Sequence, residues 1–139
     1  MRLRKSIALG LLLSVLVSGV AFAEGYWSSY MTNFGRGMNS RNWNDYHNDA
    51  AHTIIRLEGC RDEVAATNPN DWAVIRLWKH AGLFPPYSMG DKTFNCYYGA
   101  QRNWGEQTGP QWFNFSLQDF SGGTAGWNVF DAASVEVWY

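Results

Sequence analysis

Charged residues are scarce in this chain of 139 residues, and basic residues become the minority once its first segment is set aside. Lys and Arg number 11 against 12 Asp and Glu, but three of the basic residues and none of the acidic ones lie in residues 1–23. The other 116 residues carry 8 basic and 12 acidic side chains, a net charge of −4. Nucleic-acid binding needs basic side chains that displace counterions from phosphates. This balance therefore argues against nucleic acid as a partner, and equally against a polybasic membrane-disrupting peptide.

Long apolar runs are also absent, with one exception near the N-terminus. Ile7–Val20 is apolar, follows three basic residues and ends in Ala21-Phe22-Ala23, which is typical of a secretory signal peptide with a small-x-small cleavage site. The run is too short for a membrane span. We therefore expect residues 1–23 to be a signal peptide, and residues 24–139 to be a secreted, extracellular protein of one domain without a membrane span.

Cysteine is limited to Cys60 and Cys96. In a chain exported to an oxidising compartment, one disulfide between them is the simplest interpretation. The loop that it closes holds about 35 residues, for which the chain-entropy model gives roughly 3–4 kcal/mol of stabilisation. A redox-active pair needs close spacing such as Cys-x-x-Cys, which this sequence lacks. We therefore predict a structural disulfide.

Helical periodicity is missing from residues 24–139, and alternation with period two takes its place. It predicts a short strand through Trp127–Phe130 and four clearer strands, the second with two partly buried faces: Thr53–Glu58, Trp72–Lys79, Gln111–Leu117 and Ser134–Tyr139. Turn-forming Gly, Pro and Asn residues separate these segments. The predicted fold class is all-β: an antiparallel β-sandwich, or flattened barrel, with one disulfide.

Three segments fit this alternation poorly. Residues 24–48 are rich in Trp, Tyr, Asn and Ser, and form either a strand followed by a long ordered loop or an N-terminal arm. Asp62–Ala66 is a candidate short helix after Cys60. Asp131–Ala133 is either one helical turn or a bulge. The secondary structure of these three segments is therefore not decided by the sequence pattern.

Motifs for catalysis are weak. Ser40 with Asp45 and either His47 or His52 would supply a hydrolytic triad, but no Gly-x-Ser-x-Gly elbow occurs. The two histidines lie five residues apart in a segment without helical periodicity, so they do not make a helical zinc motif. The adjacent pair Asp62-Glu63 is more simply a solvated turn than the separated acids of a glycosidase. We therefore expect no enzyme activity, no catalytic residues, no metal site and no cofactor.

An oxygen-rich cluster surrounds Trp43 and leaves two interpretations open. Calcium prefers six to eight hard oxygen ligands, which such a loop can supply, although the mid-loop glycine and final glutamate of an EF-hand are lacking. Asn and Asp also stabilise turns by bonding their own backbone. The cluster consists of Asn42, Asn44, Asp45, Asn48 and Asp49.

Aromatic residues are the abundant class, with 22 in residues 24–139. A domain of this length cannot bury all of them, so we expect three or four to be exposed together, where they would contact another molecule. The loop Leu83-Phe84-Pro85-Pro86 is a second contact candidate, since its prolines make it rigid. Our candidate binding residues are Trp27, Tyr30, Phe34, Trp43, Tyr46 and Trp104.

Several short motifs resemble small secreted proteins of actinomycetes, among them the adaptor subunits of umbrella-type toxin particles. The motifs are Trp27-Ser28-Ser29-Tyr30, Asn33-Phe34, Ser40-Arg41-x-Trp43-x-Asp45, Gly59-Cys60, Cys96, Asn103-Trp104-Gly105 and Val135-x-Val137. The resemblance implies a non-enzymatic β-sandwich with one disulfide, which links a large repeat-containing toxin subunit to a lectin-bearing subunit.

Our leading hypothesis is thus a secreted protein-binding module, an adaptor or accessory subunit of an extracellular antibacterial complex. The alternative is a lectin-like module that binds carbohydrate through exposed Trp and Tyr side chains. A small hydrolase is the third hypothesis.

Overall fold

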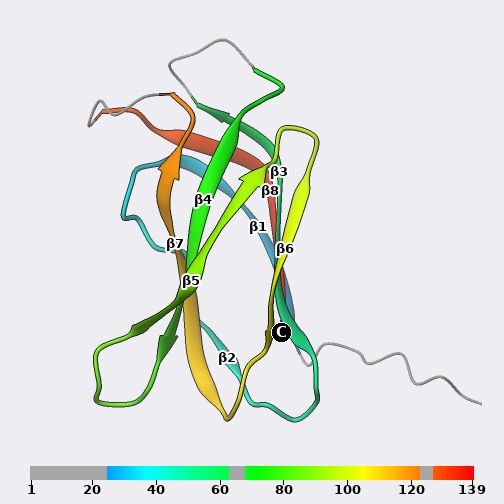
Figure 1. Cartoon of the computed structure of the whole chain (residues 1–139), viewed down its shortest axis with the longest axis vertical. Helices are drawn as coiled ribbons and strands as arrows, with labels where there is room; N and C mark the ends of the chain where they lie inside the picture. The colour runs from blue at the N-terminus through cyan, green and yellow to red at the C-terminus, as the bar shows by residue number, and fades with distance from the viewer. Residues whose placement is uncertain (1–24, 63–67, 123–126) are drawn as a thin grey trace, which may run out of the picture.

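A computed structural model describes residues 25–62, 68–122 and 127–139. These residues form eight strands, which build two four-stranded antiparallel sheets in the orders β1-β8-β3-β6 and β2-β7-β4-β5. Figure 1 shows the sheet that contains β4, β5 and β7 in front of the one that contains β1, β3 and β8. The bounds are β1 Tyr26–Phe34, β2 Trp43–Asp45, β3 His52–Asp62, β4 Trp72–His80, β5 Tyr87–Asn95, β6 Ala100–Glu106, β7 Gln111–Phe120 and β8 Phe130–Trp138.

The predicted β-sandwich is confirmed, and alternation along four strands explains its core. The inward residues of β3, β4, β7 and β8 are almost fully buried, because the inner faces of the two sheets pack against each other. The second face of β4 is half-buried, as predicted. The buried set includes Ile55, Leu57, Ala73, Ile75, Leu77, Phe113, Phe115, Leu117, Val135 and Val137.

Two of the segments whose secondary structure the sequence left open contribute residues to strands, residues 24–48 to β1 and β2 and Asp131–Ala133 to β8. Residues 26–34 form β1, which pairs with β8, and a loop then leads to β2, so the strand-and-loop alternative is the one observed. The separate strand through Trp127–Phe130 is wrong: Trp127 precedes β8 and is 80% exposed. Asp131–Ala133 is not a helical turn, because it pairs with β3 as part of β8. The bulge alternative agrees with the register against β1, where β8 advances three residues from Val135 to Ala132 while β1 advances two from Ser29 to Met31. The predicted signal peptide and most of the candidate helix 62–66 lie outside the described residues.

All four edge strands are short or irregular. β2 has only three residues, and β1 shifts register against β8 twice, between Ser29 and Met31 and again before Phe34. The pairings of β5 with β4 and of β6 with β3 each contain one shift. Such interruptions are typical of the exposed edges of natural sheets.

The predicted disulfide joins the two sheets. Cys60 lies in β3, Cys96 directly follows β5, and their Cα atoms are 5.3 Å apart. Two backbone hydrogen bonds of 3.2 Å accompany it, from the N–H groups of Gly59 and Cys60 to the carbonyls of Tyr97 and Cys96. Gly59 has a φ of 65°, and a Cβ there would lie 2.6 Å from that of Ala133. Only glycine fits this crossing without strain. A disulfide is consistent with an extracellular protein.

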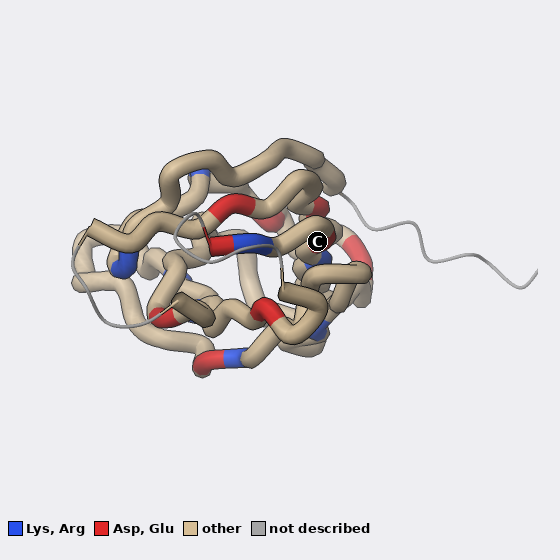
Figure 2. Tube along the Cα trace, turned by 90° about the horizontal axis from the view of Figure 1, so that it is seen from above, with Lys and Arg blue, Asp and Glu red and all other residues tan. Residues whose placement is uncertain are grey.

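No helix capable of crossing a lipid bilayer is found within the described ranges. Figure 2 shows the basic and acidic residues of these ranges spread around the sandwich, often next to one another. The positive charges are thus not gathered on one face of the kind that binds nucleic acid.

Candidate functional site

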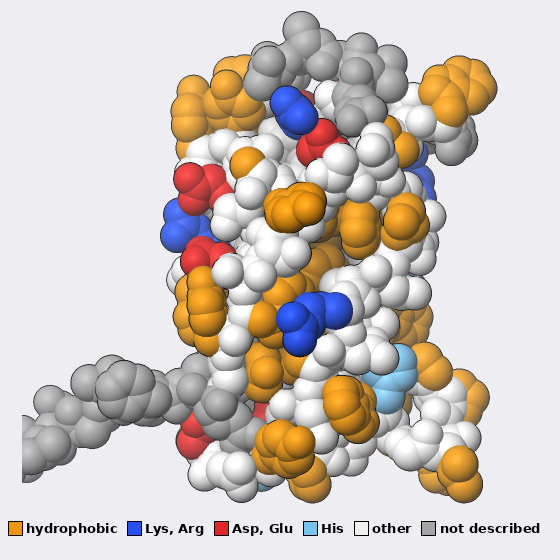
Figure 3. Space-filling view, turned by 180° about the vertical axis from the view of Figure 1, so that it is seen from behind, with side chains coloured by type: hydrophobic (Ala, Val, Ile, Leu, Met, Phe, Trp, Pro, Cys, Tyr) orange, Lys and Arg blue, Asp and Glu red, His pale blue; other side chains and the backbone are white. Residues whose placement is uncertain are grey.

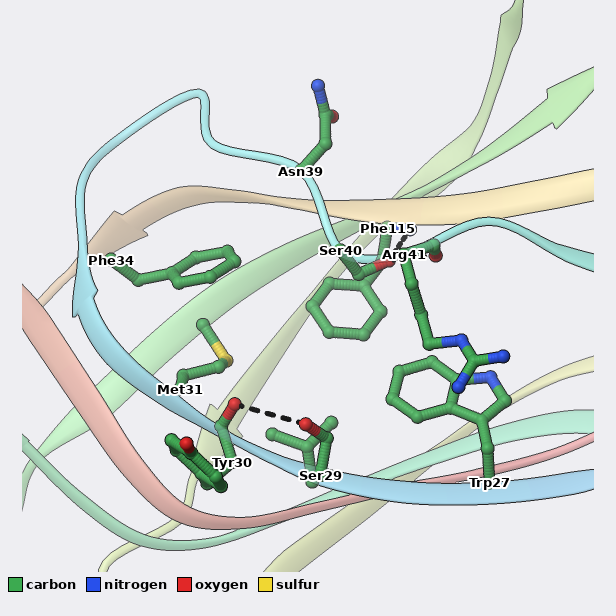
Figure 4. A pocket seen from close by; sticks show the side chains of 10 residues that line it. Trp27, Ser29, Tyr30, Met31, Phe34, Asn39, Ser40, Arg41 and Phe115 are labelled. Atoms are coloured by element: carbon green, nitrogen blue, oxygen red, sulfur yellow. Dashed lines mark hydrogen bonds between the residues drawn. The ribbon is translucent and has the colours of Figure 1, made fainter.

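A groove of about 190 Å³ opens along β1 at one side of the sandwich. Figure 4 shows its walls: side chains of β1 face the segment 39–41, with Phe115 of β7 between them. The groove is lined by Trp27, Ser29, Tyr30, Met31, Phe34, Asn39, Ser40, Arg41, Phe115 and Val135. Figure 3, the view from behind, shows hydrophobic side chains in a hollow along this face of the molecule.

The groove exists because the two sheets end here without closing on each other. β1 is the edge of one sheet and the short β2 is the edge of the other. The segment before β2 bonds to β7, with Gly37 N–H donating to Leu117 O at 2.7 Å and Ser40 N–H donating to Phe115 O at 2.8 Å. This segment therefore follows β7 and leaves a groove between itself and β1. Apolar side chains that belong to the core form the floor of the groove.

Arg41 is the one charged side chain among the described residues that line the groove. Its guanidinium carbon lies 5.5 Å from the centre of the Trp27 ring, a distance suited to a cation–π contact. Figure 4 shows the guanidinium beside the nitrogen edge of that ring. Trp27 Nε1 is buried without a hydrogen-bond acceptor among the described residues, and Arg41 makes no ion pair with any of them. The groove thus offers a cation beside an apolar floor.

The structure brings together three of the six predicted binding residues. Trp27, Tyr30 and Phe34 all line the groove; Tyr30 is 70% exposed, whereas Trp27 is 8% exposed and forms part of the floor. Tyr46 is also exposed but follows β2 and does not line the groove. Trp104 lies on β6, half-buried, with its ring centre 6.2 Å from that of Phe94.

Trp43 lies in the core. It is 2% exposed, and its ring packs against Trp27, Phe113 and Tyr139 at centroid distances of 5.8, 6.2 and 6.0 Å. β2 places it between the sheets, where it fills the space beside β1. The burial of Trp27 and Trp43 corrects the expectation that both indoles are displayed at the surface.

The expected surplus of exposed aromatic side chains is confirmed. Eight of them are at least 47% exposed in the described part of the chain. Trp112 and Trp127 are two that sequence reasoning did not select. The alternation of β7 could have identified Trp112, since it faces opposite to the buried Phe113. The eight are Tyr26, Tyr30, Tyr46, Phe84, Tyr87, Tyr98, Trp112 and Trp127.

The carboxylates near Trp43 bond to their own loop. Asp45 Oδ1 accepts from His47 N–H at 2.9 Å, and Asp49 Oδ1 accepts from Ala51 N–H at 2.8 Å. These are turn contacts of the kind that Asp makes in loops. In the ranges that the structure describes, no group of three or more His, Cys, Asp or Glu is arranged to hold a metal ion.

The residues of the imagined triad have separate partners. Ser40 Oγ accepts from Phe115 N–H at 3.0 Å and donates to Arg41 O at 2.9 Å. His52 Nδ1 lies 2.8 Å from Asn103 Nδ2, and His47 Nε2 lies 3.8 Å from Glu106. The Ser40 hydroxyl therefore helps to fix the segment before β2 to β7.

No protein-family model, curated protein or solved structure matches this chain.

One ion pair on the outer face of β4 and β5 changes a carboxyl pKa. The Arg76 guanidinium donates two hydrogen bonds to Asp91, of 2.5 and 2.8 Å, and lowers the pKa of Asp91. A carboxyl group whose pKa is lower in the folded state stabilises the fold above the unfolded value of about 3.9, and that contribution disappears as pH falls through the folded pKa.

Asp91→Asn should therefore cause a small loss of stability at pH 7 that vanishes in acid. The side chains of the pair are 31% and 39% exposed, so solvent screening keeps the effect small. Melting temperatures of the variant and the wild type, measured from pH 7 down to about 2.5, check this expectation. An equal difference at both ends of the range would show that the ion pair is not the cause.

Proposed function

We propose that this protein is a non-enzymatic, secreted module that binds another extracellular protein through the groove beside β1. The observation that carries the proposal is the combination in that groove of apolar lining, with Tyr30 exposed at its edge, and Arg41, a cation that has no acidic partner in the described residues. Apolar surface and an arginine beside aromatic rings are features that protein interfaces enrich. The resemblance to adaptor subunits supports a place in an extracellular antibacterial toxin complex.

The size of the groove favours side chains of a macromolecule over a small ligand. Its volume of about 190 Å³ is below the roughly 300–1,000 Å³ of pockets that enclose small molecules. One or two apolar side chains of a partner would fill it. Phe34 and Met31 at one end and Trp27 at the other set its apolar length.

The charges favour a partner segment that carries an acidic residue. No Asp or Glu is among the described residues that line the groove, so a carboxylate beside the apolar anchor would meet Arg41 without repulsion. Residues 26–34 of this protein are paired in the sheet as β1 and form one wall of the groove. We therefore infer that the partner supplies the inserted segment.

The β4–β5 loop is a second contact surface in this proposal. Leu83 is fully exposed and Phe84 is 76% exposed, and Figure 1 shows their loop extending from one end of the sandwich. A turn hydrogen bond from Phe84 N–H to Ala81 O, at 3.2 Å, and the two prolines limit its freedom. An apolar loop held in this way can be buried by a partner at a low cost in conformational entropy.

Tyr30→Ala and Arg41→Glu should each weaken capture of the partner by about tenfold or more, since both side chains flank the apolar floor. The purified mature protein is immobilised, partners from the native secretions are identified by mass spectrometry, and affinities of the captured protein are then measured for each variant. Tyr98→Ala is the matched control, because Tyr98 is the same residue type with similar exposure, 79% against 70%. Capture of no protein, or equal affinity for all variants, would refute the groove as the contact site.

A further inference from the structure

A second groove lies on the outer face of the sheet that contains β4 and β7, on the opposite side of that sheet from the core. Its volume is about 380 Å³, within the range of pockets that hold small ligands. Its lining differs from that of the groove beside β1, because most of its residues are polar and uncharged. It is lined by Gly37, Asn39, Trp78, His80, Pro86, Asn114, Ser116 and Gln118.

Strand register places these side chains together. Trp78 of β4 is paired with Asn114 of β7, and His80 with Trp112, so all four point away from the core. An outer face is usually solvated, yet Asn114 is 8% exposed and Ser116 is 2% exposed. The segment 37–40 and the neighbouring indole enclose them. The floor of this groove is therefore polar and largely removed from water.

The hydrogen bonds on this floor leave donors and acceptors unused. Ser116 Oγ accepts two bonds of 2.6 Å, from Trp78 Nε1 and from Gln118 Nε2. A hydroxyl accepts two bonds and donates one, and Ser116 Oγ donates to no described residue. Asn114 Oδ1 lies 3.1 Å from His80 Nε2, while the Asn114 amide nitrogen bonds to no group in the described ranges. The hydroxyl oxygens of a ligand could accept a hydrogen bond from the Ser116 hydroxyl and another from the Asn114 amide.

The walls supply further contacts of two kinds. The Asn39 side chain makes no hydrogen bond within the described part of the chain, and Figure 4 shows it directed away from the groove beside β1. Trp112 is not one of the lining residues, but it borders the groove, because it is paired with the lining residue His80 on the same face and is 52% exposed. Trp78 is held by its bond to Ser116 and by Arg76, whose guanidinium carbon is 5.3 Å from its ring centre. Amide groups and fixed indole rings thus surround a polar floor.

We propose that this groove binds a neutral carbohydrate. A sugar ring combines an apolar C–H face, which packs on an indole, with hydroxyl groups that donate and accept hydrogen bonds, and the groove offers a partner for each. No Asp, Glu, Lys or Arg is among the described residues that line this groove, so a charged sugar gains no ion pair with such a residue there. The site shares only Asn39 with the lining of the groove beside β1, and the proposal does not depend on the proposed protein contact.

The experiment titrates the mature protein with neutral hexasaccharides of glucose, of N-acetylglucosamine and of mannose, and follows intrinsic tryptophan fluorescence and heat. We expect at least one hexasaccharide to bind, and Trp112→Ala to weaken it by about tenfold or more. Asn39→Ala, which removes an exposed side chain without hydrogen bonds, should weaken it by about fivefold. Trp127→Ala is the matched control, because Trp127 is 80% exposed and neither lines this groove nor is paired with a residue that does, whereas Trp112 is paired with His80.

The outcomes separate the two sites. Tyr30→Ala should keep full sugar affinity, and loss of sugar binding in Trp112→Ala with intact protein capture would support independent sites. A hexasaccharide of galacturonic acid and a neutral hexapeptide serve as comparison ligands. No binding of any neutral hexasaccharide, equal loss in Trp127→Ala and Trp112→Ala, or binding of only the acidic sugar or the peptide would each overturn the proposal.

Discussion

Replacing Trp43 by alanine should lower the free energy of unfolding by about 3–5 kcal/mol. The indole is almost fully buried and contacts three other aromatic rings, so its removal loses apolar burial and leaves a cavity that β2 and β1 cannot fill without moving. Urea denaturation of the purified mature protein measures the effect. Trp127→Ala, at an exposed position, should change stability by no more than about 0.5 kcal/mol.

The result bears directly on the binding residues predicted from the sequence. If Trp43 were displayed to a partner, Trp43→Ala would abolish capture while leaving the melting temperature nearly unchanged. The packing of Trp43 leads us to expect a large fall in stability, and weaker capture only because less protein is folded. A variant as stable as the wild type would contradict the position of Trp43 between the sheets.

The double variant Cys60→Ser, Cys96→Ser should lose roughly 3–4 kcal/mol of stability. The disulfide spans 36 positions of the chain and ties β3 to the segment after β5, so it limits the unfolded chain over about a third of its mature length. Urea midpoints of the variant and of the wild type, each with and without a reducing agent, measure the loss.

Reduction should destabilise the wild type by a similar amount and leave the double variant unchanged. That second comparison separates loss of the covalent link from any effect of the serine side chains. An unchanged midpoint on full reduction of the wild type would refute the expectation. Because a small domain has a net stability of only about 5–15 kcal/mol, the reduced protein should be close to unfolding at 37 °C.

The sequence predicted those strands whose two faces have different environments. Ile55 and Leu57 alternate with Arg56 and Glu58, and the structure buries the first pair and leaves the second pair partly exposed. β5 and β6 were not predicted, because both lie at sheet edges and most of their side chains meet solvent. A strand with little buried surface imposes no alternation on its sequence, and its position depends on backbone pairing with a distant segment.

The candidate site could also be predicted only in part from local sequence. Composition predicted that some aromatic side chains would be exposed, which is confirmed, but it could not say which ones. Trp27 and Tyr30 are three positions apart on β1, so strand alternation places them on opposite faces, and one is buried while the other is exposed. Pairing with β8 decides which of the two faces meets the core, and that pairing cannot be derived from local sequence. The groove on the outer face likewise depends on which residues of β4 and β7 are paired.

The irregular edges of the two sheets also bear on self-association. A fibril grows when copies of a chain stack through long, straight, unpaired edges, with each copy serving as a template for the next. Here β2 is too short to serve as a template, and the register shifts of β1, β5 and β6 interrupt the straight row of N–H and C=O groups that an incoming strand requires. A protein that displays many aromatic side chains is in this way protected against edge-to-edge assembly into amyloid.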